Sequence, residues 1–360
     1  MQTPLKAQGP RPARIAAEVI RQHAELVAFL WAQRDSWSAE DPPDARVIAG
    51  IDQRLEINLD ALRIAAASAW PFLIAQHEDF PDKGELFAFA WMALELADGE
   101  KVAQAVEFGR LTSDDAKGLV GALAWHKPAV IGPVVRKWIG EPDAFLRFLA
   151  VSACAEHTVD PGATLARLVK DHDPRVRTAA LRLAGQLRRF DLVRDVHDAF
   201  DHEDERVRLW AGWALVELGS GDLTRQELRK IAAAAGPDAM VALRALAKAG
   251  PDKDVRAWMG GLMKAQQTAP LAVRGIGMLG DRSVLAWLIE RMREPYVAVA
   301  ACAAFLELFP EARLETKLFT VGPEELGPAF AQHFENDVVK LALPDRVQAW
   351  WSEKGTVPQR

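Results

Sequence analysis

The chain has 360 residues, enough for two ordinary domains or one long array of repeats. Half of the residues are hydrophobic, Ala and Leu dominate and Tyr occurs once, a composition that favours helices over strands. The net charge of −6 argues against a dedicated nucleic-acid binder, which usually shows a basic balance or a concentrated basic face.

The N-terminal part is expected to form an atypical helical cap without a repeat. Residues 1–11 lack the apolar core of a signal peptide, so we expect a disordered tail and a cytoplasmic protein. Within residues 12–110, "ARIAAEVIRQHAELVAFLWAQRDSW" and "RVIAGIDQRLEINLDALRIAAASAW" each predict one long amphipathic helix, joined by the loop "SAEDPPDA". No run of 18 apolar residues occurs, so no transmembrane helix is expected.

Residues 111–310 repeat themselves with a period near 31. Val176-Arg177 and Val207-Arg208 each follow an acidic turn and precede small residues at helical spacing. Similar anchors occur at Ala116-Lys117, Leu146-Arg147, Val241, Val273-Arg274 and Val297. A second amphipathic segment follows each anchor, so about seven helix–turn–helix units are predicted. Stacked units bury each other's apolar faces, which predicts an all-α, right-handed α-solenoid, with residues 311–360 as a C-terminal helical cap.

The repeat pattern resembles HEAT-like repeats of the short kind found in bilin-lyase-type repeat proteins. The acidic or Pro turn, "VR", spaced alanines and "LG" carry this resemblance, best at residues 173–187, 204–219 and 271–281. The resemblance implies the fold and leaves the function open, because such scaffolds serve many tasks.

The N-terminal block resembles the opening of a family of bacterial HEAT-repeat proteins without an assigned function. That family tends to be encoded near type VI secretion effectors, tip proteins and adaptors. The matching residues are His23, Phe29, Leu30, Trp31, Arg34, Asp52, Arg54, Leu55, Asn58, Leu59 and Leu62. This resemblance implies a genetic context rather than a chemistry.

Two turns share an Asp-His start, "DHDPRVR" at Asp171 and "DHEDERVR" at Asp201. His and carboxylates can bind zinc. The repeat offers a simpler interpretation, in which Asp171 and Asp201 occupy equivalent turns and cap the helices that follow. His172 and His202 would then lie one unit apart, about 10 Å, too far to share an ion. We therefore expect N-caps and no metal.

No motif for catalysis or for a cofactor is visible. The eight His are scattered, and neither Cys154 nor Cys302 has basic neighbours that would lower its thiol pKa strongly. "GIGMLG" loosely resembles a dinucleotide fingerprint, but it lies inside a repeat helix without a preceding strand. We expect a non-enzymatic protein without cofactor, metal or small-molecule substrate.

Basic side chains on the second helices are the predicted partner-binding residues, because the second helix of a HEAT-type unit usually lines the concave face. These residues are Arg136, Arg167, Lys170, Arg189, Arg194, Arg225, Arg229, Lys230, Arg256 and Arg291. Two interpretations stay open: a solvated face with ordinary salt pairs, or a groove for an acidic partner.

Tryptophans give a second set of candidate contacts. Most of the 12 Trp are expected in the core, and Trp210 and Trp213 are expected to pack between units. Trp37 and one of the adjacent Trp350 and Trp351 are the predicted exposed aromatic anchors.

These patterns together predict a binding scaffold whose partner is a protein. Given the second resemblance, that partner would be a secreted type VI effector or its delivery machinery, which the chain neutralises as an immunity protein or loads as a chaperone or adaptor. The alternative is a nucleic-acid-binding HEAT-like module, such as a DNA glycosylase-like enzyme. Neither nucleic acid nor a membrane is the expected partner.

Overall fold

The computed structural model describes residues 16–114, 116–221, 224–250, 253–335 and 337–355, so the predicted tail at 1–11 lies outside the described residues. The chain divides into two compact units, Met1–His157 and Thr158–Arg360, here called unit 1 and unit 2. Their border falls inside the predicted repeat region. The predicted domain boundaries at 110 and 310 stay predictions.

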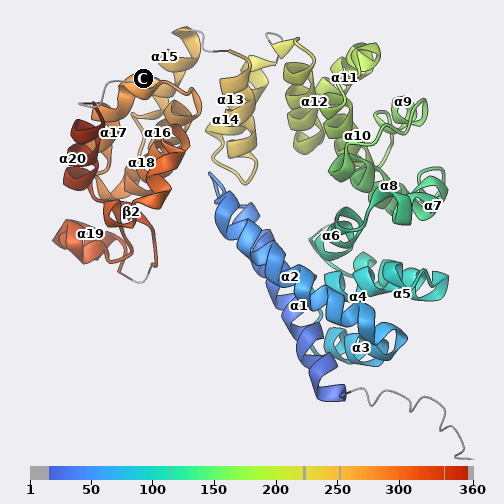
Figure 1. The fold of residues 1–360 in the computed structure, drawn as a ribbon. Coiled ribbons are helices and arrows are strands. Elements are labelled where there is room, and N and C mark those ends of the chain that lie inside the picture. The colour runs from blue at the N-terminus through green and yellow to red at the C-terminus, as the bar shows by residue number, and fades with distance from the viewer. Residues whose placement is uncertain (1–15, 115, 222–223, 251–252, 336, 356–360) are drawn as a thin grey trace, which may run out of the picture. The chain divides into compact units, whose positions relative to one another are not determined.

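Unit 1 is built around one helix, α4, whose residues from Leu86 to Leu94 are all buried. Helices α1, α3, α5 and α6 pack around it (Figure 1). The elements of unit 1 are α1 (Ala17–Ser38), α2 (Ala45–Ala65), η1 (Ala66–Ala69), α3 (Trp70–Asp79), α4 (Lys83–Glu95), α5 (Gly99–Arg110), α6 (Lys117–Trp125), α7 (Pro128–Trp138) and α8 (Ala144–His157).

The two long N-terminal helices that the sequence predicts are present as α1 and α2, and they pack against each other. The His23 ring Nδ1 lies 2.8 Å from Asn58 Oδ1, and Arg34 Nε donates to Asp52 Oδ1 at 2.6 Å. The predicted end of the second helix at Trp70 is wrong. Helix α2 ends at Ala65, because Ala66 has a left-handed φ of 48° that the alanine-rich sequence does not reveal.

Unit 2 continues the helix pairs. Its elements are α9 (Thr164–Leu168), α10 (Pro174–Gln186), η2 (Phe190–Leu192), α11 (Val193–Asp198), η3 (Ala199–Asp201), α12 (Glu205–Glu217), α13 (Arg225–Ala233), α14 (Ala239–Lys248), α15 (Lys253–Leu262), α16 (Ala269–Met278), η5 (Arg282–Val284), α17 (Leu285–Arg291), α18 (Pro295–Leu308), η6 (Pro310–Leu314), η7 (Thr316–Leu318), β1 (Phe319–Thr320), η8 (Pro323–Leu326), α19 (Pro328–His333), β2 (Leu341–Ala342) and α20 (Pro344–Gly355). The predicted all-α solenoid of HEAT-like pairs is confirmed. Each predicted anchor lies in or next to the first helix of a pair.

The C-terminal region differs from the purely helical expectation. A short antiparallel pair joins Phe319 to Ala342 and Thr320 to Leu341. The β2 residue Leu341 packs with Phe330 and Phe334 of the α19 region against Ala298 of α18. The strands are only two residues long, too short for the alternating pattern by which a sequence reveals a strand.

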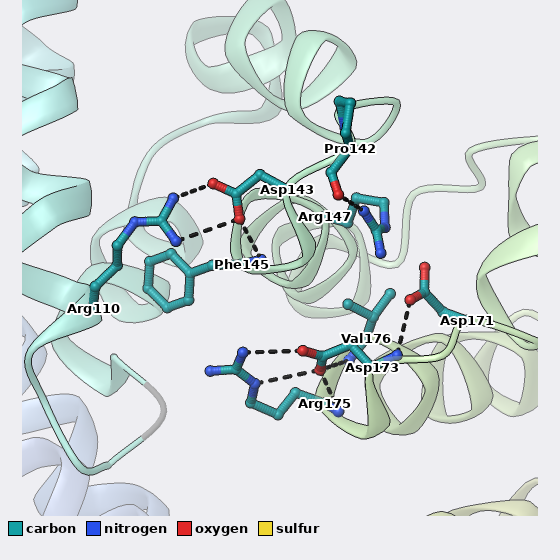
Figure 2. A network of polar contacts seen from close by, with 9 residues as sticks. All are labelled: Arg110, Pro142, Asp143, Phe145, Arg147, Asp171, Asp173, Arg175 and Val176. Carbon is teal, nitrogen blue, oxygen red and sulfur yellow. Dashed lines mark hydrogen bonds and ion pairs between the residues drawn. The ribbon is translucent and has the colours of Figure 1, made fainter.

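Aspartates lie at the starts of α8, α10 and α12, but at positions other than those predicted. Asp173 accepts hydrogen bonds from the backbone N–H groups of Arg175 and Val176, and it is the N-cap of α10 (Figure 2). Asp204 accepts from Val207 N–H and caps α12. In unit 1, Asp143 accepts from Phe145 N–H at the start of α8. The expectation that Asp171 and Asp201 are the N-caps is therefore wrong.

The two Asp-His pairs are also not equivalent. Asp171 accepts from the N–H two residues ahead, that of Asp173, at 3.1 Å. The same contact in the next unit is made by His202, whose Nδ1 accepts from Asp204 N–H at 3.1 Å. Asp171 thus corresponds to His202, 31 residues on, in register with the two Val-Arg anchors. The two Asp-His pairs therefore occupy positions that differ by one residue within the repeat, and their similarity is a coincidence.

One stretch bears on the expectation of no transmembrane helix. By length and composition alone, Ala45–Asp79 could cross a membrane. In the structure it is three elements rather than one rod, and its α2 part buries Leu55, Leu59 and Leu62 within the unit. The expectation of no membrane contact stays a prediction.

Candidate interaction face

The helices of unit 2 form two layers that differ in spacing. The first helices α10, α12, α14, α16 and α18 each pack directly on the next one in this series. The second helices α9, α11, α13, α15 and α17 pack on first helices, and within the described residues no two of them make contacts of comparable extent. The first helices of unit 2 therefore form one continuous layer of direct contacts, and the expectation that the second helices line a concave face stays a prediction.

The predicted basic residues mostly hold their own surroundings together. Five of them form ion pairs: Lys170 with Asp195 (2.7 Å), Arg189 with Asp160 (2.9 Å) and Asp191 (2.7 Å), Lys230 with Glu227 (3.1 Å), Arg256 with Asp281 (3.0 Å) and Arg291 with Glu294 (2.9 Å). Arg225 donates to the carbonyl oxygen of Ala249 at 3.0 Å, and Arg229 lies over Trp258 at 5.8 Å. Such contacts hold the turns in place and join neighbouring helix pairs to each other.

The remaining three predicted cations are exposed. Arg167 lies on α9, Arg194 on α11, and Arg136 on α7, which belongs to unit 1. The structure does not gather the ten residues into one cluster with a shared ligand geometry. Their role in binding stays a prediction.

The predicted aromatic anchors lie in different environments. Trp350 is 5% exposed and packs edge-on against Phe305 and Phe309, so it belongs to the core. Its neighbour Trp351 is 36% exposed, and Trp37 near the end of α1 is half-buried. Trp351 is therefore the member of the adjacent pair that can meet a partner.

Trp210 and Trp213, which the sequence predicts to pack between units, also leave part of their surface accessible on the first helices. Trp210 and Trp213 on α12 are half-buried, with ring centroids 5.4 Å apart in an edge-to-face arrangement. Arg182 on α10 lies over Trp210 with its guanidinium carbon 5.8 Å from the ring centroid. Both Trp rings pack against the core cluster of Leu209 and its neighbours while leaving part of their surface accessible.

Polar contacts continue this group across the remaining first helices. Lys248 on α14 pairs with Glu217 on α12 at 2.6 Å. Glu307 on α18 binds both Arg244 on α14, at 3.1 Å, and Arg274 on α16, at 2.6 Å. Side-chain contacts therefore link α10 to α12, α12 to α14, and α14 and α16 to α18. We call Arg182, Trp210, Trp213, Glu217, Arg244, Lys248, Arg274 and Glu307 the first-helix face.

Burial and pairing together set the charge of Glu307, which lies at the α18 end of this face. Burial alone would raise the pKa of Glu307, but the hydrogen bonds from Arg244 and Arg274 outweigh burial and hold it below the ordinary value. Arg274 is only 3% exposed. A buried arginine on a carboxylate fixes three successive helices with respect to each other.

Repeat spacing was the signal that could have found this face. Arg182, Trp213 and Arg244 are each 31 residues apart, and Arg274 follows 30 residues later, so they occupy the same position of successive first helices. A search for large polar or aromatic residues at one position of the repeat reveals these four residues. An analogy about which helix layer is concave does not reveal them.

Chemically, the face is suited to contact rather than reaction. Trp and Arg are the residues that most often dominate binding energy at protein interfaces. Within the described residues no group of three or more His, Cys, Asp or Glu side chains could hold a metal ion. Burial raises the pKa of the Cys302 thiol to about 12, which makes it a poor nucleophile at neutral pH.

Comparison with known proteins addresses the repeats. Residues 162–264, which span α9 to α15, match the family described as HEAT repeats. No curated protein matches the chain. HEAT repeats commonly act as protein-interaction scaffolds and are generally non-enzymatic. The matched segment is therefore similar to HEAT repeats, and the helix pairs continue beyond it towards both ends.

Proposed function

We propose that this protein is a non-enzymatic scaffold that binds a protein partner on the first-helix face. The observation that carries the proposal is the pair Trp210 and Trp213, half-buried beside Arg182 on the closely packed layer. A rigid aromatic and arginine surface loses little conformational entropy on binding. The common use of HEAT repeats as interaction scaffolds supports the same conclusion.

The partner that we propose is a type VI effector or a component of its delivery machinery, met in the cytoplasm of the producing cell. The resemblance of the N-terminal block to a family encoded near such genes supports this assignment. The matching residues include the pairs His23–Asn58 and Arg34–Asp52, which couple α1 to α2, so the resemblance concerns an intact structural element. The chain would neutralise the effector or load it for export.

The test is affinity capture with the tagged full-length chain, followed by mass spectrometry and by binding measurements on the protein recovered. We expect a stoichiometric partner encoded by a neighbouring reading frame. Trp213→Ala should weaken its binding by about tenfold or more, as truncation of a hot-spot tryptophan does. Lys248→Glu, a change at an exposed side chain that places two acids together on the face, should also weaken it.

The matched control is Phe190→Ala, which removes a 62% exposed aromatic side chain from η2, outside the residues of the first-helix face. It should leave the affinity unchanged. Recovery of no stoichiometric protein partner contradicts the proposal. Tight binding to duplex DNA with a steep salt dependence would also contradict it, and would favour the nucleic-acid alternative.

A further inference from the structure

The first-helix face has two tryptophans on α12 with cations on both neighbouring helices. Trp210, Trp213 and Glu217 lie at positions i, i+3 and i+7 of α12, so they share one side of this helix. On the α10 side, Arg182 lies over the Trp210 ring. On the α14 side, Lys248 pairs with Glu217. We call the following residues the tryptophan patch: Arg182, Trp210, Trp213, Glu217, Arg244 and Lys248.

The two tryptophan rings are held in place by their surroundings. A Cβ on Gly185 would lie 2.7 Å from the Trp213 ring, so this ring rests directly on α10. Trp210 packs against Trp213 with ring centroids 5.4 Å apart, and both rings contact the core cluster that contains Leu209. An aromatic surface that is already ordered loses little conformational entropy when a partner binds it.

The charges of the patch are arranged with the cations outside and the carboxylates beneath. The Lys248 side chain is 58% exposed, whereas that of its partner Glu217 is 10% exposed. Arg244 and its partner Glu307 show the same order, at 41% and 26%. A lysine has three N–H donors and an arginine five, so each can bind a further carboxylate. A partner therefore meets aromatic surface and positive charge.

The spacing of the patch defines the length of the segment that fits it. Packed helices lie about 8–10 Å apart, so α10 and α14 are separated by about 16–20 Å, with α12 between them. An extended chain advances about 3.3 Å per residue and crosses this distance in about five or six residues. Carboxylates at the two ends of such a segment reach Arg182 and Lys248, and a residue midway lies over the tryptophans.

We propose that the tryptophan patch binds an acidic segment of the protein partner, in which a large apolar side chain packs on Trp210 and Trp213 between flanking carboxylates. This inference rests on the function proposed above and adds the chemistry of the partner. A long polyanion such as duplex DNA fits less well, because it extends beyond the patch along a chain whose net charge is −6.

Selection from a phage library of random peptides, each about twelve residues long, tests this chemistry before the partner is known. The full-length wild-type chain is the target, and a variant with Trp210→Ala and Trp213→Ala removes peptides that bind elsewhere. We expect the peptides that require the tryptophans to carry an apolar residue with Asp or Glu on both sides. Neutral or basic peptides would overturn the inference and leave the proposed function standing. Recovery of no peptide that requires the tryptophans would contradict both.

Charge exchange on the exposed Lys248 tests the same contact without altering the tryptophans. Fluorescence anisotropy measures the binding of the most enriched peptide to the full-length chain. Lys248→Glu should weaken binding about tenfold or more, because like charges then oppose each other. A peptide with lysine in place of its acidic residue on that side should recover most of the loss. Circular dichroism should show unchanged helicity, since the side chain is exposed.

The matched control is Lys264→Glu, which reverses the charge of another exposed lysine of unit 2, located after α15. It should leave the affinity for the peptide unchanged. Equal losses in the two variants, or no loss in Lys248→Glu, would overturn the inference. Displacement of the peptide by duplex DNA at micromolar concentration in physiological salt would also overturn it, because the cations of the patch would then bind phosphates.

Discussion

Aspartate side chains cap the N-termini of α10 and α12, and the effect of such a cap can be measured alone. Asp204 accepts from Val207 N–H at the start of α12, whereas the exposed Asp201 makes no such contact. Asp204→Ala should lower the free energy of unfolding by about 1 kcal/mol, the usual contribution of an N-cap. Asp201→Ala should change it little. Urea titration followed by circular dichroism measures both, and equal effects would contradict the assignment of the cap.

The same residues show what a sequence reveals at this scale. Acidic turns before the repeat helices were predictable, because Asp favours N-caps. Which acid of each turn is the N-cap was not predictable, because Asp171 and His202 make the same turn contact with different chemical groups. The register had to be taken from Val176 and Val207, which are buried and cannot slip without exposing apolar surface.

A buried histidine gives the second prediction at the residue scale. His77 lies between Phe89 and Phe108, and its Nδ1 has no hydrogen-bond partner in the described residues. His77→Phe keeps a ring and removes the unsatisfied nitrogen, so the free energy of unfolding should rise by about 1 kcal/mol at pH 7.5.

The gain from His77→Phe should grow as the pH falls. Burial lowers the pKa of His77 below its ordinary value of 6.5. Below pH 6.5 the unfolded wild-type chain therefore takes up a proton that the folded chain resists, and the wild type loses stability relative to the variant. Thermal unfolding at pH 7.5 and 5.5 measures the difference. A gap that narrows on acidification would show that His77 is charged in the folded state.

Close contact between first helices depends on glycine at particular positions. A Cβ on Gly277 of α16 would lie 2.7 Å from the Ala304 Cα of α18, and Gly185 of α10 meets α12 in the same way. Gly277→Ala should therefore destabilise unit 2 by about 1–3 kcal/mol through overpacking. Gly260→Ala is the matched control in α15. With open space around it, it should stabilise by about 0.5–1 kcal/mol, the ordinary helix preference for alanine. Calorimetric melting temperatures that move in the same direction would exclude this account.

At the element scale, the sequence predicted the helices that obey a strong period and missed those decided by a single backbone angle. The anchors in α10 and α12 are flanked by small residues in every turn, so their helices were predictable. The break at Ala66 was not, because alanine ordinarily continues a helix. The β1–β2 pair was missed because each strand has only two residues and the pairing joins Phe319 to Ala342 across a long intervening segment.

At the scale of the whole molecule, the candidate site depends on which layer of helices meets the partner. The ten predicted cations were chosen by analogy for the second helices, and many are occupied in local pairs, as Arg189 is with Asp160 and Asp191. The first-helix face arises from contacts between units, such as Arg244 with Glu307, which are 63 residues apart. Only the packing of the units brings such residues together.

Unit 2 should fold without unit 1, because its apolar clusters are closed within it. One cluster centres on Phe305 and Phe309, and another on Leu243 and Leu246; all the residues packed in them come from the region after His157. In a repeat array each unit is stabilised mainly by its neighbours, so removing one end leaves the remaining contacts intact. A fragment of residues 158–360 should therefore show helical circular dichroism and one cooperative thermal transition. Gly277→Ala should lower the melting temperature in the fragment by about as much as in the full chain, since the α16–α18 contact is the same. A fragment that melts without cooperativity, or that loses the effect of Gly277→Ala, would mean that the core of unit 2 requires unit 1.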